Sequence, residues 1–409
     1  MGWIAFGLTL SLMAEQAVMF AVPLIIYERT HSVASSGLAF ALEWLPPILA
    51  YPFAGLLADR VGGPRLYRMA NAARAACLLT AMCACFLLPG WTVQILVGSS
   101  VLLSVLIAPN RMAIQKTIAY VGPDQELAQR LSLLQNIELV SMAAGPGIAA
   151  AVAHYTGKLP LFGIASGAFL LAILCWRKIP GAPPTSSVAG TVLSDLALGW
   201  RLLFANRAVT LLAGANFSIN LVFAVVLSAN AFMITGRFHA PEYVLGMMSA
   251  GAGALGLINL VLVPTILRLW SIHRLGLGGF LLVSASLIAL GLAPNVWVYG
   301  IAFLLAMAGV TLFNVFNRTE RIKAIGKEHL GKVSGVFYLL NAFSYPLGGA
   351  ITASVGALYG AQHIILGMAV LLALLGIPLL LTVIHYFTHA AGAERDTAPA
   401  QEQRVAGAK

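Results

Sequence analysis

The feature that most constrains this chain is a series of long apolar segments. A helix needs about 20 mostly apolar residues to cross a bilayer. Twelve windows meet this requirement, with approximate limits 2–27, 33–58, 69–88, 91–112, 131–154, 159–177, 208–235, 241–268, 275–293, 295–317, 332–357 and 362–387. With 60% apolar and only 9% charged residues, the 409-residue chain does not have the composition of a soluble domain. We therefore expect an all-α integral membrane protein with twelve transmembrane helices.

The basic residues predict how such a chain is oriented. If the N-terminus is cytoplasmic, 21 of the 24 basic residues fall on the cytoplasmic side, Arg74 and Arg111 among them. Only Arg29, Lys158 and Arg237 fall outside. Cytoplasmic loops accumulate Lys and Arg, so we expect both termini to be cytoplasmic. The net charge of +10 is then a topology signal with some affinity for anionic lipid, and no nucleic-acid partner is expected.

The longest polar interruption divides the chain near its middle. We expect an N-terminal six-helix half at 1–178, a cytoplasmic linker at 179–207, a C-terminal six-helix half at 208–387, and a disordered cytoplasmic tail at 388–409. An internal similarity favours two related halves. Asn110-Arg111 follows the fourth window and Asn317-Arg318 follows the tenth, 207 positions later.

A short polar loop separates the second window from the third. Its acid, bases and turn formers predict a tight helix-to-helix hairpin at a membrane surface. The residues Gly55, Asp59, Arg60, Gly62 and Arg65 resemble the signature loop between helices 2 and 3 of the major facilitator superfamily, Gly-x-x-x-Asp-Arg-x-Gly-Arg-Arg. The loop departs from that pattern at Gly63 and Pro64, so that Arg65 is the first base available.

This resemblance implies two pseudo-symmetric six-helix halves that rock around a central site. It also implies a gating role for the signature loop. In that role the Asp59 carboxylate would accept hydrogen bonds from the start of the eleventh window.

Glycine and proline recur at comparable places in the two halves. Gly145 and Pro146 lie in the fifth window and Pro346 in the eleventh, where they predict helix hinges. Gly145-Pro146 resembles the core of the antiporter motif on helix 5 of proton-coupled drug exporters, with Ala149 and Ala150 where glycine is usual. The stretch from Pro123 to Pro146 resembles the subfamily that includes the enterobactin exporter and related drug and siderophore efflux pumps.

Three carboxylic acids lie at membrane depth in the predicted spans, away from the span ends: Glu15, Glu43 and Glu138. Acids at membrane depth usually face a cavity and have a function. Apolar surroundings disfavour the ionised form, which would let such a group exchange protons near neutral pH. We expect Glu15 to be the main proton-coupling group and Glu43 its nearest functional neighbour. The alternative is that each acid stays protonated and joins two helices by a hydrogen bond.

Amide and phenol side chains are the candidates for contacting a substrate. They are Gln16, Asn136, Asn216, Asn220, Tyr338 and Asn341. Asn216 and Asn220 are one turn apart and share a helix face. A buried asparagine can equally join two helices.

The sequence lacks the motifs of nucleotide binding, metal hydrolysis or Ser/His/Asp catalysis. We expect no cofactor, no metal site and no enzyme activity. The expected function is secondary active transport, with export of a siderophore or drug-like molecule in exchange for protons, by a monomer in the bacterial inner membrane. Alternatives are an uptake permease, a ferroportin-like metal exporter or, outside transport, a membrane enzyme or sensor.

Overall fold

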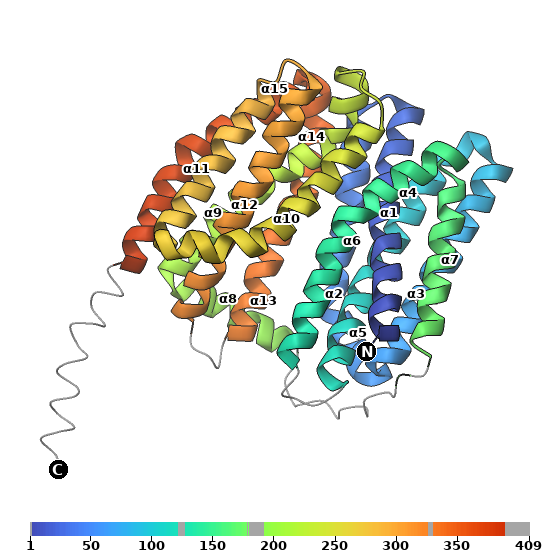
Figure 1. Ribbon diagram of the computed structural model, residues 1–409, viewed down its shortest axis with the longest axis horizontal. Helices are drawn as coiled ribbons and strands as arrows, with labels where there is room; N and C mark the ends of the chain where they lie inside the picture. Colours follow the sequence, from blue (N-terminus) through green and yellow to red (C-terminus); the bar gives the residue numbers. More distant parts are fainter. Residues whose placement is uncertain (1, 122–126, 178, 180–191, 326–329, 389–409) are drawn as a thin grey trace, which may run out of the picture.

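The computed structural model describes residues 2–121, 127–177, 179, 192–325 and 330–388, and in this part of the chain every regular element is helical. One bundle contains α1 (Gly2–Thr30), α2 (Val33–Val61), α3 (Gly63–Leu87), α4 (Thr92–Val105), α5 (Ile107–Tyr120), α6 (Leu127–Thr156) and α7 (Pro160–Cys175). The other contains α9 (Arg207–Ala231), α10 (Tyr243–Leu269), α11 (Ile272–Gly291), α12 (Val296–Ala324), α13 (Leu330–Ala342), α14 (Ser344–Tyr359) and α15 (Ala361–Leu371). Figure 1 shows the two bundles side by side, with the short α8 (Val192–Ala205) at the lower end.

The all-helical membrane fold predicted from the sequence is confirmed. Nine helices of the described residues are long and apolar enough to cross a membrane, and each coincides with a predicted window. The remaining three windows differ in detail. The window 159–177 corresponds to the shorter α7, and 241–268 corresponds to α10, which begins two residues later and ends one residue later than the window. The window 332–357 is divided into α13 and α14 at Phe343.

Polar side chains fix where several of these apolar helices begin. Asn206, Ser271 and Asn295 precede α9, α11 and α12, and each side chain accepts a hydrogen bond from a backbone N–H of the first turn. The turn between α2 and α3 depends on Gly62, whose φ of 84° favours glycine. The ends of the apolar stretches therefore carry local stop and start signals.

The two bundles meet along two pairs of helices, α2 with α14 and α6 with α10. Small residues make this close contact possible. A Cβ atom added at Gly37 would lie 2.6 Å from the Gly349 carbonyl oxygen, and one at Gly349 would lie 2.7 Å from the Gly37 oxygen. A Cβ added at Gly253 of α10 would overlap Ala143 of α6. The interface is thus a pair of narrow lines, which leaves room for a cavity between them.

Candidate substrate cavity and ion-pair network

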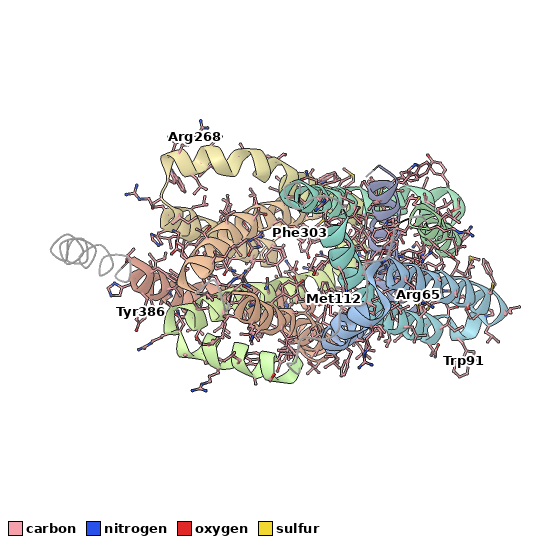
Figure 2. All side chains as sticks on the ribbon, turned by 90° about the horizontal axis from the view of Figure 1, so that it is seen from below. Arg65, Trp91, Met112, Arg268, Phe303 and Tyr386 are labelled. Carbon is pink, nitrogen blue, oxygen red and sulfur yellow. The ribbon has the colours of Figure 1, made fainter. Side chains whose placement is uncertain are left out.

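A cavity of about 930 Å³ lies between the bundles. Helices α1, α2, α5 and α6 supply most of its wall, and α13 and α8 supply the rest. Its volume is within the range of about 300–1,000 Å³ typical of small-molecule sites. Met112, labelled in Figure 2, is one of the lining residues and lies where the bundles face each other. Its polar lining residues are Glu15, Gln16, Glu43, Tyr51, Arg111, Gln115, Glu138, Lys332 and Tyr338.

The cavity reaches one end of the molecule only. Leu196 of α8 and Lys332, in the first turn of α13, line it at the end that carries α8. We call this the α8 end. The opposite end carries Lys158, between α6 and α7, and we call it the Lys158 end.

Contacts between the bundles close the Lys158 end. The Lys158 ammonium group pairs with Glu28 of α1 and with Glu242, which precedes α10 in the other bundle. We call these three residues the Lys158 bridge. Beside it, the Tyr27 ring packs edge-on against Phe232 at a centroid distance of 5.8 Å. Burial, together with a hydrogen bond to Glu28, raises the pKa of the Glu242 carboxyl although Lys158 is close.

Four charged side chains form a continuous network within the first bundle. Arg74 Nη2 donates to Glu15 Oε2 at 2.5 Å, and Arg111 Nη2 donates to Glu15 Oε1 at 3.0 Å. Arg111 Nη1 also donates to Glu138 Oε1 at 2.5 Å. We call these residues the Glu15 network. Its two arginines and two carboxylates compensate each other, so the network contributes no net charge to the cavity.

The surroundings of Glu15 differ from the sequence-based prediction. Glu15 is 5% exposed, as a membrane-depth acid should be, but two guanidinium groups rather than apolar side chains face it. Assigning Arg74 and Arg111 to cytoplasmic segments was wrong, because both lie within helices and Arg74 is only 2% exposed. The position of Arg74 inside the predicted window 69–88 was the signal that could have revealed this.

Glu43 has the environment that had been expected for Glu15. It is 9% exposed and lines the cavity from α2. Within the described residues it has neither an ion-pair partner nor a hydrogen-bond partner. Next to it, the Trp44 ring stacks on Tyr345 at a centroid distance of 4.1 Å, and the Trp44 indole N–H has no acceptor. This cavity wall therefore carries an unpaired carboxyl group, and the next residue is a tryptophan whose buried N–H has no acceptor.

The structure brings only part of the predicted substrate-contacting set to the cavity. Gln16 and Tyr338 line it. Asn216 and Asn341 do not; Asn216 Nδ2 donates to Asn341 Oδ1 at 2.7 Å, and Asn317 Nδ2 donates to Asn216 Oδ1 at 2.9 Å. These asparagines join α9, α12 and α13. Asn136 is exposed and Asn220 half-buried, and neither is among the lining residues.

The predicted hinge and gating residues are placed as follows. Helix α6 continues through Gly145 and Pro146, whereas the break between α13 and α14 lies three residues before Pro346. The surroundings of Gly55 and of the Asp59 side chain lie outside what the structure describes. Arg60, in the last turn of α2, and Arg65, in the first turn of α3, are exposed. Lys116 Nζ donates to the Ala58 carbonyl oxygen at 3.1 Å, which ties α5 to the end of α2.

We expect Asn216→Ala to reduce thermal stability. It removes the donor to Asn341 and the acceptor for Asn317, and an unsatisfied buried polar group costs about 1–3 kcal/mol. Asn220→Ala is the matched control, because it lies one turn away on the same helix and has no hydrogen bond of this kind. Melting temperatures in detergent measure the effect. Equal melting of the two variants would contradict a structural role for Asn216.

The fold and the cavity define the class of protein. Two helical bundles that meet along narrow lines and enclose a solute-sized cavity are the architecture of a transporter that alternates its access. The chain matches the Major Facilitator Superfamily over residues 4–348 and belongs to this superfamily. It is therefore a multi-pass integral membrane protein and a secondary transporter, not an enzyme.

Solved structures of transporters share this fold at low sequence identity. A bacterial homologue of the iron transporter ferroportin matches with a TM-score of 0.73 and 16% identity, over 94% of this chain and 98% of that chain. A bacterial homologue of the human lysosomal transporter Spinster matches with a TM-score of 0.72 and 13% identity, over 95% of this chain and 96% of that chain. The nucleoside transporter NupG matches with a TM-score of 0.68 and 15% identity, over 94% of this chain and 99% of that chain. At these identities the likeness is one of fold.

Proposed function

We propose that this transporter exports a small organic molecule in exchange for protons. The observation that carries the proposal is the unpaired Glu43 carboxyl in the wall of the central cavity. A buried acid without a cationic partner is uncharged at little cost and charged at a high cost, so it can bind and release a proton as its access to water changes. Glu15 instead holds two arginines in position. We therefore assign proton binding to Glu43 and the organisation of the cavity wall to the Glu15 network.

The cavity wall supports a drug-like or siderophore-like substrate. Trp44, Tyr51 and Tyr338 present aromatic surface to the cavity. The compensated charges of the Glu15 network leave Glu43 as the group whose ionisation changes the net charge of the site. A hydrogen-bonding or cationic molecule that displaces the Glu43 proton would be exchanged for it without covalent chemistry.

The orientation follows from the placement of basic residues. We propose that the α8 end faces the cytoplasm, so that the cavity here is accessible from inside, and that both termini are cytoplasmic. When Arg74 and Arg111 are no longer counted as cytoplasmic, Lys and Arg are still strongly concentrated on this side. We further propose that the protein resides as a monomer in the bacterial inner membrane.

A cysteine-labelling experiment tests this orientation. In a variant without the native cysteines, Lys323→Cys is expected to react with a membrane-impermeant maleimide only after the cells are opened. Arg237→Cys, at the opposite end, is expected to react in intact cells. Reaction of Lys323→Cys in intact cells would reverse the proposed topology.

Transport in proteoliposomes tests the proposed activity. A pH-sensitive dye inside the vesicles records proton movement when siderophores, drug-like cations or nucleosides are added under an imposed pH gradient. We expect substrate to move against the direction of the protons. Substrate and protons that move in the same direction would instead identify an uptake permease, and transport that is indifferent to the gradient would remove the proposed coupling.

A further inference from the structure

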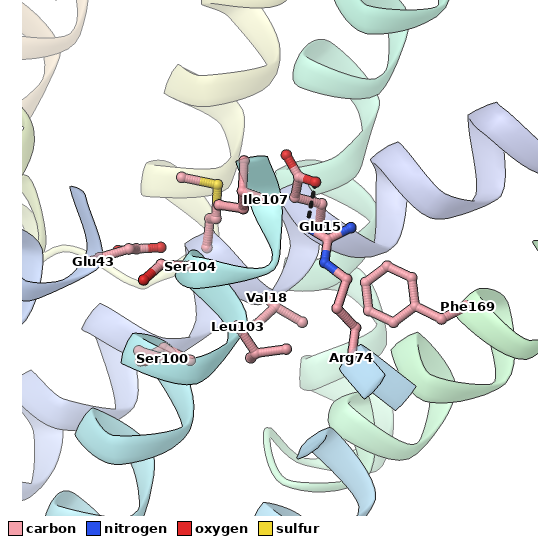
Figure 3. Close-up of a pocket in the computed structure, with 11 residues that line it drawn as sticks. Glu15, Val18, Glu43, Arg74, Ser100, Leu103, Ser104, Ile107 and Phe169 are labelled. Carbon is pink, nitrogen blue, oxygen red and sulfur yellow. Dashed lines mark hydrogen bonds and ion pairs between the residues drawn. The ribbon is translucent and has the colours of Figure 1, made fainter. Parts of the chain in front are cut away.

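A second, much smaller cavity of about 20 Å³ lies inside the first bundle, next to the central one. Figure 3 shows its wall, with Glu43 on one side and Arg74 and Phe169 on the other. Glu15, Met19, Glu43 and Ile107 line both cavities. This volume accommodates one water molecule, since a water needs at least about 10–15 Å³ of such space, and it excludes an organic substrate.

Arg74 supplies the unsatisfied donors of this small cavity. Its Nη2 donates to Glu15, while Nε and Nη1 have no hydrogen-bond partner although the side chain is 2% exposed. The Phe169 ring lies 4.9 Å from the guanidinium carbon and accepts no conventional hydrogen bond. Buried N–H groups in native proteins are almost always paired with protein or with water. The free N–H groups of Arg74 therefore call for an acceptor inside the cavity.

Acceptors line the other side. Ser100 Oγ donates to the Leu96 carbonyl at 2.8 Å and Ser104 Oγ donates to the Val101 carbonyl at 2.8 Å. Because each hydroxyl proton is used within α4, the oxygen lone pairs remain to accept a hydrogen bond. Ser104 lies beside the unpaired Glu43 carboxyl in Figure 3. A water molecule, which both donates and accepts, matches donors on one side and acceptors on the other.

We propose that this cavity is an internal water site that links Arg74 to Glu43 through hydrogen bonds. The water joins the proton-binding carboxyl to the Glu15 network, so that protonation of Glu43 is transmitted to Arg111 in the substrate cavity. The second part of this inference rests on the proposed function, whereas the water site itself does not. The other titratable groups that line a cavity with Glu43 are Glu15, Arg111, Glu138, Lys332, Tyr51 and Tyr338.

An electron-density or cryo-EM map that resolves ordered water tests the site in the wild-type protein. We expect a peak within hydrogen-bonding distance of Arg74 Nε. An empty cavity would overturn the proposal. A halide could also accept from Arg74, although Glu15 and Glu43 in the same wall disfavour an anion. Anomalous signal at this position after exchange into bromide would show that the site binds an anion and not a water molecule. That result would overturn the proposal as well.

Ser104→Val tests the link to Glu43. The valine side chain is expected to fill the space of the water, and the substitution removes the Ser104 hydroxyl oxygen as an acceptor. Ser99→Val is the matched control, because Ser99 is buried on the same helix, donates to Leu96 O at 2.9 Å and does not line the cavity. The readout is the infrared C=O band of the protonated Glu43 carboxyl, assigned by its loss in Glu43→Gln.

We expect this band to move to higher frequency in Ser104→Val, as its hydrogen bond to water is lost, and to stay unchanged in Ser99→Val. The pH midpoint of proton-driven transport should move in Ser104→Val alone. An identical Glu43 band in the wild type and Ser104→Val would overturn the link. Wild-type proton coupling in Glu43→Gln would be a separate result: it would reject the proposed function and leave the water site standing.

Discussion

Replacing Glu43 with glutamine is expected to abolish proton-driven transport while leaving the fold intact. The carboxyl has no ion-pair partner to lose, and glutamine keeps its size and a hydrogen-bonding group. We expect proton-driven flux to fall at least about tenfold, since coupling free energies of 1–3 kcal/mol correspond to roughly 5- to 150-fold. Exchange of substrate across the vesicle membrane without a pH gradient should persist. Flux in proteoliposomes from pH 5.5 to 8.5 is the measurement.

Two other acids of the same cavity serve as controls. Glu138→Gln removes a carboxylate that is paired with Arg111 and 42% exposed, so transport should keep its pH profile. Glu15→Gln leaves Arg74 and Arg111 without their shared carboxylate. Breaking a buried ion pair from one side costs about 3–5 kcal/mol, so this variant should lose thermal stability. The assignment of proton binding to Glu43 is wrong if Glu43→Gln retains wild-type proton-driven flux. It is also wrong if Glu15→Gln keeps its thermal stability but loses the coupling of transport to protons.

The sequence was sufficient for the features that depend on neighbouring residues. Apolar length predicted the helices, and capping residues such as Asn206 and Asn295 mark where they begin. The positive φ of Gly62 agrees with the tight hairpin predicted from the signature loop. The three membrane-depth acids were found because charged residues are rare in apolar windows. Two of the predicted substrate contacts, Gln16 and Tyr338, do line the cavity.

The partners of these groups could not be predicted in the same way. Glu15 pairs with Arg74 and Arg111, which lie 59 and 96 residues away. Sequence periodicity gives the face of one helix but not which face of another helix meets it. From the sequence, Glu15 ranks above Glu43 as the proton-coupling candidate because it lies nearer the middle of its span. In the structure the two acids differ instead in their ion pairs, since Glu15 has two arginine partners and Glu43 has none among the described residues. The same limit applies to Asn216, whose partners Asn317 and Asn341 are 101 and 125 residues away.

Reversing the charge of Lys158 is expected to open the end of the molecule that is closed here. The lysine joins Glu28 of one bundle to Glu242 of the other, and Lys158→Glu would place three carboxylates together. The side chains are partly exposed, so the bridge itself contributes no more than about 1 kcal/mol. That is still roughly a fivefold change in the ratio of two conformations. Spin labels at Tyr155 and Trp297, both exposed and on different bundles, would report the separation.

Glu242→Gln separates the charge of the bridge from its geometry. Because burial and Glu28 raise the pKa of the Glu242 carboxyl, the closed form disfavours the ionised acid, and a neutral glutamine is expected to keep this end closed. The sign follows from linkage: a raised pKa in the closed form means that closure binds the proton more tightly. Lys158→Met should lie between Glu242→Gln and Lys158→Glu. If all three variants give the wild-type distance distribution, packing of Tyr27 against Phe232 closes this end and the ion pairs do not.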